Sequence, residues 1–146
     1  MKTFFAHHSL GFPHIFRRFH PDPNWILTHA KAFNLNSSQI KQEKKLITEM
    51  TPDTIKGVVK LKKALKQYKI DAKQNNPSIT KLISDVKAVG SAETYLGYEM
   101  IPFHIKAYRV LYPSQQSLYH RLAKINWMKK MQMIHKQKMQ KTNMMH

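Results

Sequence analysis

"TPDTIKGVVKLKKALKQYKIDAKQ", residues 51–74, is the stretch that decides the fold. Thr51 is placed to cap a helix, Pro52 suits its first turn, and Asp53 favours the positive end of the helix dipole. Apolar side chains then recur at steps of three and four, at Val58, Leu61, Leu65, Tyr68 and Ala72. This spacing predicts an amphipathic α-helix with an apolar face toward the core and lysines on its outside.

Two helix starts are expected before this stretch. Asp22 followed by Pro23 predicts an N-cap and first turn for a short helix. Asn36 and Gln39 have the spacing of a capping box, which predicts a second helix from there to about residue 50.

After it, residues 79–89 repeat the apolar spacing, and Gly90 is expected to end that helix. Residues 94–113 alternate like a strand and also step like a helix, and we expect helix. Ser114, just after Pro113, is placed to cap a last helix that runs to about Lys141.

The expected fold class is therefore mainly α. A small irregular helical domain, residues 22–125, lies between an extended basic N-terminal arm, residues 1–21, and a long C-terminal helical tail, residues 126–146. With 146 residues, the chain has the size of one domain with arms.

Charge separates these parts. The formal net charge is +17, yet all eight acids lie between Asp22 and Glu99. The two ends carry only basic residues, which predicts a polyanionic partner. Dense lysines suit sequence-independent contacts to a phosphate backbone, and arginine between phenylalanines can stack on unpaired bases. The residues expected to bind nucleic acid are Arg17, Arg18, Lys60, Lys62, Lys63, Lys66, Lys69, Lys129, Lys130, Lys136, Lys138 and Lys141.

The tail, "WMKKMQMIHKQKMQKTNMMH" from Trp127 to His146, holds six of the nine methionines and no acid. Leu118, Leu122 and Ile125 form a stripe that is expected to continue the core. The residues expected to dock on a partner lie roughly opposite: Trp127, Met131 and Ile134. We therefore expect a helix that changes neighbours after Ile125.

Few chemistries fit this composition. The chain has no cysteine and four glycines, and it lacks the glycine-rich phosphate loops and the nucleophile elbow. The acids are mostly expected on helix surfaces rather than paired in a pocket. No acid precedes Asp22, so stacking or phosphate contact fits His7, His8, His14 and His20 better than zinc binding. We expect no catalytic residues, metal or cofactor, and no apolar run is long enough to span a membrane.

Two functions from different classes remain. The first is a structural protein of a mitochondrial ribosome that contacts rRNA and neighbouring proteins. The second is an accessory subunit of a respiratory-chain or ATP synthase complex, peripheral to the membrane, with lysines facing anionic lipid headgroups. The acid-free, aromatic and basic N-terminus resembles a mitochondrial presequence, and an arm extended over a partner is the other interpretation.

Overall fold

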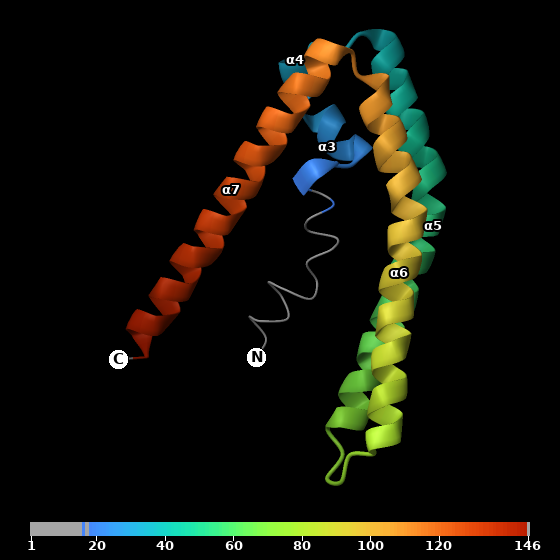
Figure 1. The fold of residues 1–146 in the computed structure, drawn as a ribbon, viewed down its shortest axis with the longest axis vertical. Coiled ribbons are helices and arrows are strands. Elements are labelled where there is room, and N and C mark those ends of the chain that lie inside the picture. Colours follow the sequence, from blue (N-terminus) through green and yellow to red (C-terminus); the bar gives the residue numbers. More distant parts are fainter. Residues whose placement is uncertain (1–15, 17, 146) are drawn as a thin grey trace.

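The computed structural model describes residue 16 and residues 18–145, and within them the protein is helical throughout (Figure 1). The helices in this part are α3 (Pro23–Thr28), α4 (Ala30–Phe33), α5 (Ser37–Ala72), α6 (Ile79–Val110) and α7 (Pro113–Met144). No strand occurs among the described residues, so the expected mainly α class is confirmed. Of residues 94–113, which had two interpretations, 94–110 belong to α6, 111 and 112 form the turn after it, and Pro113 begins α7.

The two predicted caps near the N-terminal end are present. The Asp22 carboxylate accepts a hydrogen bond from the Trp25 backbone N–H at 2.8 Å, and α3 begins at Pro23. Asn36 and Gln39 form the reciprocal capping box of α5, with distances of 2.8 and 3.1 Å. Each cap depends only on neighbours in sequence, which is why spacing alone finds it.

Three predicted helix boundaries are wrong. Thr51 does not cap a new helix, because α5 continues through Pro52 and the Thr51 hydroxyl donates to the Ile47 carbonyl at 2.6 Å. Gly90 does not end α6, which also runs through Pro102. The N-cap of α7 is Tyr112 rather than Ser114, since Pro113 takes the first position of the helix and the Gln115 side chain accepts from the Tyr112 N–H at 2.7 Å.

Long-range packing explains the uninterrupted helices. α5 and α6 run antiparallel and side by side along most of their length (Figure 1). Buried positions on α5 recur every seven residues, at Glu43, Met50, Gly57, Ala64 and Asp71. This is the period of a coiled coil, and it continues on both sides of Pro52. Contacts with α6 on both sides offset a proline cost of about 3 kcal/mol or more.

The hydrophobic core lies at one end of this hairpin, where α3 and α4 pack between α5, α6 and the start of α7 (Figure 1). Its buried members are Ile26, Phe33, Leu46, Ala107, Leu111 and Tyr119. A buried amide pair joins the helices there. Gln39 Nε2 donates to Gln115 Oε1 at 2.7 Å and to the Val110 carbonyl at 3.0 Å, and Gln115 Nε2 donates to the Phe33 carbonyl at 2.9 Å. These bonds fix α7 against α4, α5 and α6.

The predicted apolar face of α5 is displaced from the contact with α6. Gly57, Ala64 and Asp71 are buried, whereas Val58, Leu65 and Tyr68 are 37, 39 and 39% exposed. Small residues make the contact because they let the two backbones approach closely. The aliphatic stripe therefore lies beside the seam with α6.

Two of the three helical glycines, Gly57 and Gly90, give a matched prediction. A Cβ added at Gly57 would overlap the Leu96 side chain, whereas one added at Gly90 has no neighbour within 4 Å. We expect Gly90→Ala to raise the free energy of unfolding by roughly 0.5–1 kcal/mol through helix propensity. Gly57→Ala should lower it by about 1–2 kcal/mol, since crowding outweighs that gain. Urea denaturation measures both, and equal stabilisation by the two changes would contradict the close approach of α5 and α6.

Candidate nucleic-acid interface

The five predicted lysines of α5 are all exposed, but they lie on two sides of the helix. Lys60 and Lys63, together with Lys56, form one row at steps of four and three, next to Tyr95 of α6. The Lys60 ammonium lies 4.1 Å from the Tyr95 ring centroid, and this cation–π contact holds the Lys60 side chain against α6. Lys62, Lys66 and Lys69 form a second row on the outer surface. A phosphate-bearing partner could contact either row.

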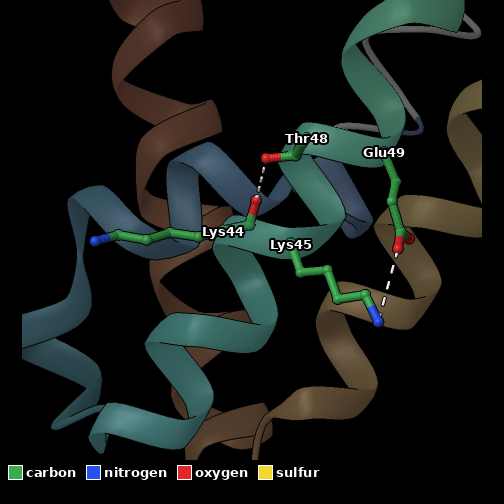
Figure 2. A network of polar contacts seen from close by, with 4 residues as sticks. All are labelled: Lys44, Lys45, Thr48 and Glu49. Atoms are coloured by element: carbon green, nitrogen blue, oxygen red, sulfur yellow. Dashed lines mark hydrogen bonds and ion pairs between the residues drawn. The ribbon is translucent and has the colours of Figure 1, made fainter.

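The protein offers these lysines little negative charge. Among the described residues the only ion pair is Lys45 with Glu49, at 3.9 Å on α5; Figure 2 shows it beside the Thr48 hydroxyl, which donates to the Lys44 carbonyl. Five of the eight acids are engaged elsewhere, which leaves the lysine rows uncompensated. Those acids are the Asp22 cap, the buried Glu43, the paired Glu49, and Asp71 with Asp85.

Asp71 and Asp85 form a buried carboxyl pair near the tip of the hairpin. Gln67 donates to Asp71 Oδ2 at 3.0 Å, and this bond together with the one from Asp85 lowers the pKa of Asp71. Burial, followed by the bond and charge of Asp71, raises the pKa of Asp85. Asp85 therefore retains its proton more readily than Asp71 does, and Asp85 Oδ2 has no hydrogen-bond partner among the described residues. The pair joins α5 to α6, and the lysine whose charge acts on it is Lys81 rather than a lysine of the two rows.

The predicted lysines of α7 are Lys129, Lys130, Lys136, Lys138 and Lys141, and all are exposed. They point in several directions around the helix, because their spacing does not follow a single helical stripe. No described residue of α7 beyond Ala123 is buried, and in Figure 1 this end extends away from the hairpin. A partner that neutralised all five would have to surround the helix.

The described parts of the two acid-free ends meet at one pocket. It has a volume of about 160 Å³ and lies between the segment before α3 and the middle of α7. The Arg18 guanidinium stacks over Trp127 at 5.3 Å and over Phe19 at 4.8 Å. The residues that line the pocket are Arg18, Pro21, Asp22, Trp25, Ala123, Asn126, Trp127 and Lys130.

This pocket combines residues that were assigned separately. Arg18 and Lys130 were predicted to bind nucleic acid, whereas Trp127 was predicted to dock on a partner, and the structure places all three together. Trp25 and Asn126 also line the pocket and were missed, because no local pattern marks them. Arg17 lies outside the described residues, as do His7, His8 and His14.

The core stripe predicted for α7 is confirmed at Leu118 and Leu122 and is wrong at Ile125. Tyr119 and Ala123 are the buried residues there, while Leu118 and Leu122 pack at the margin of the core. Ile125 is 48% exposed and does not continue the core. Trp127 follows Ala123 by four residues, is 38% exposed and lines the pocket. Met131 and Ile134 lie on the same side of α7 as Trp127, at steps of four and three, and this side is about opposite Leu118 and Leu122.

Titratable groups form no catalytic arrangement in the described part of the chain. Burial raises the pKa of Glu43 to about 8, but this side chain is 0% exposed and no substrate could reach it. His104 is also buried, and its Nδ1 lies 2.7 Å from the His20 carbonyl oxygen. Among the residues that the structure describes, no three His, Cys, Asp or Glu side chains come close enough to hold a metal ion.

Within the described residues, no helix combines the length and apolarity that crossing a membrane requires. The chain matches no protein-family model, no curated protein and no solved structure.

Proposed function

We propose that this protein is a non-catalytic structural component of a large RNA–protein assembly, the mitochondrial ribosome, in which it contacts rRNA and neighbouring proteins. The observation that carries the proposal is uncompensated positive charge. The exposed lysine rows of α5 and the exposed lysines of α7 have no ion-pair partner in the described part of the protein. When lysines neutralise nucleic-acid phosphates, the counterions of those phosphates are released, and this release favours binding.

The kind of basic residue supports the phosphate backbone as the ligand. Lysines are point charges on flexible stems that contact phosphates without reading sequence, whereas the low share of arginine, 4 residues against 21 lysines, favours the second function, that of an accessory subunit. The pocket with Arg18 and Trp127 adds planar groups on which an unpaired base could stack. The basic, aromatic and acid-free N-terminal sequence supports the mitochondrion as the compartment.

Fractionation of native complexes at stepped salt concentrations tests this function. We expect the protein to co-migrate with rRNA and to leave that fraction after RNase treatment. A protein that stays with a detergent-solubilised membrane complex, unaffected by RNase, would refute the ribosomal assignment.

One observation favours a second function, that of an accessory subunit of a respiratory-chain or ATP synthase complex. α7 exposes methionines, among them Met133 at 61% and Met139 at 56%. Methionine adapts to irregular protein surfaces, so these side chains suit packing on partner subunits. The lysines would then face anionic lipid headgroups. The same fractionation distinguishes the two functions.

A further inference from the structure

The half of the hairpin farthest from the core exposes aliphatic side chains that no described residue covers. On α5, Val58, Leu65 and Tyr68 are 37, 39 and 39% exposed, and they lie beside the seam with α6. Leu61 and Ala72 continue this row and are half-buried. Steps of three and four keep all five on one side of α5.

α6 carries a matching row. Ile79, Ile83 and Val86 are 77, 53 and 59% exposed, at steps of four and three. Leu82 and Val89 lie between them and the seam and are half-buried. Aliphatic side chains that are this exposed and this regular usually mark an interaction surface.

The two rows lie on the same side of the hairpin. Asp71 opposes Asp85, and Gly57 opposes Leu96, which sets the antiparallel register. On each helix, the exposed row lies next to these contact positions. It is reached from them by rotating about the helix axis in the direction in which the chain advances toward its C-terminus. Because the two helices run in opposite directions, equal displacement brings both rows to one side of the pair.

We call this side the hairpin apolar face, and it consists of Val58, Leu61, Leu65, Tyr68, Ala72, Ile79, Leu82, Ile83, Val86 and Val89. Along α5 it is roughly 20 Å long, from a rise of about 1.5 Å per residue. That length equals about four turns of a helix lying along the seam.

Positive charge borders the hairpin apolar face. Lys62 and Lys69 follow Val58 and Leu65 by four residues, and all four lysines along the border, including Lys66 and Lys87, are exposed. The acid on this side is Glu93, which is half-buried, and burial raises its pKa. A second copy of the chain would bring two positive borders together, which disfavours self-association.

We propose that the hairpin apolar face binds an amphipathic helix of another protein, with aliphatic residues toward the seam and acidic residues on its flanks. The third helix would complete a three-helix bundle in which its acids pair with the bordering lysines. The face lacks tryptophan and phenylalanine, two of the three residue types that interfacial helices bury in a membrane, and vesicle binding tests the membrane as a competing occupant. The Lys56, Lys60 and Lys63 row lies on the other side of the hairpin, whereas the bordering lysines Lys62, Lys66 and Lys69 form the second row, which an acidic helix and a phosphate-bearing partner would share.

A synthetic peptide tests the proposal on the full-length protein. The probe is a fluorescent helical peptide with leucine at heptad positions a and d and glutamate at e and g. Its matched control carries lysine in place of every glutamate. We expect anisotropy titrations to show saturable binding of the glutamate peptide and binding of the lysine peptide that is weaker by about tenfold or more. Equal affinity for both peptides, or no binding of the glutamate peptide, would overturn the proposal.

Variants locate the site. Leu65→Ser with Val86→Ser should weaken peptide binding by about tenfold or more, and Ile79→Ser with Ile83→Ser is an independent pair. These side chains are exposed, so circular dichroism should show an unchanged fold. Lys56→Gln with Lys63→Gln is the control and should leave peptide affinity unchanged. Peptide affinity that is unchanged in both serine-pair variants would show that the peptide does not bind to the hairpin apolar face.

The wild type and the serine-pair variants also test three other occupants of the hairpin apolar face. Sedimentation velocity should show a monomer, and a dimer that the serine pairs dissociate would assign the face to a second copy. RNA affinity and binding to phosphatidylserine vesicles should be the same in the wild type and the serine pairs. A loss of either in place of peptide binding would assign the face to RNA or to a membrane.

Discussion

Charge reversal of four hairpin lysines, Lys60→Glu, Lys62→Glu, Lys63→Glu and Lys66→Glu, lowers RNA affinity by about a hundredfold or more at about 0.1 M salt. All four ammonium groups are exposed and none has an ion-pair partner among the described residues. Each phosphate contact contributes about one unit to the slope of log K against log salt. Fluorescence anisotropy with a labelled single-stranded RNA at stepped salt should therefore also show a slope that is shallower by about two to four units.

A second charge-reversal variant tests whether RNA affinity depends on where the lysines lie or only on the net charge. Lys31→Glu, Lys41→Glu, Lys44→Glu and Lys45→Glu change the net charge by the same amount, and these four lysines are also exposed. They lie at the core end of the molecule, away from the hairpin rows. We expect them to reduce RNA affinity by about threefold at most, through long-range electrostatics alone. An equal loss in both variants would mean that net charge, and not the hairpin, determines binding.

The second large effect concerns Glu43 and pH. Its side chain is fully buried and neither carboxyl oxygen has a hydrogen-bond partner. Burial raises its pKa from 4.5 to about 8. Between these values the folded protein keeps a proton that the unfolded chain has released, so stability falls as pH rises. From about pH 5 to about pH 8 we expect Glu43 to reduce the free energy of unfolding by roughly 3–4 kcal/mol.

Urea denaturation at stepped pH measures this loss, and Glu43→Gln isolates it. The glutamine has nearly the same shape and does not titrate, so the variant should lose the part of the decline that belongs to Glu43. The difference between wild type and variant is the quantity of interest, because burial also raises the pKa of Asp85 and of Glu93. Parallel pH profiles for the two proteins would mean that Glu43 is hydrated or paired.

Local signals in the sequence predicted local structure. The Asp22 and Asn36 caps were found because their partners lie three residues away. The breaks expected at Pro52 and Gly90 did not occur, because α5 and α6 support each other across both positions. That support is a contact between distant segments, and propensity carries no information about it.

The burial pattern of α5 shows a second limit. An apolar stripe marks a face that needs covering, but it does not say what covers it. Here Gly57, Ala64 and Asp71 make the contact with α6, and neither glycine nor aspartate registers in a search for apolar periodicity. The apolar stripe that the sequence predicts, with Val58, Leu65 and Tyr68, is the one that stays partly exposed.

Part of the candidate interface could be predicted from the sequence, and part could not. The exposed lysines of α5 and α7 were predictable, because long basic side chains without acidic neighbours remain at the surface. The pocket was not, since Arg18 and Trp127 are far apart in sequence and meet only when α7 packs beside the segment before α3. The predicted core stripe of α7 is also wrong at its end, because Ile125 is 48% exposed and Ala123 is the buried residue there.

Ultraviolet crosslinking of the native assembly, followed by mass spectrometry of nucleotide-modified peptides, is the most direct test of an RNA-binding structural role. We expect nucleotide adducts on peptides that contain the lysine rows of α5, on the Trp127 region of α7, and on no peptide from the core helix α4. The crosslinked RNA should be rRNA. Peptides of α5 and α7 without any nucleotide adduct, but crosslinked to subunits of a membrane complex, would contradict that role.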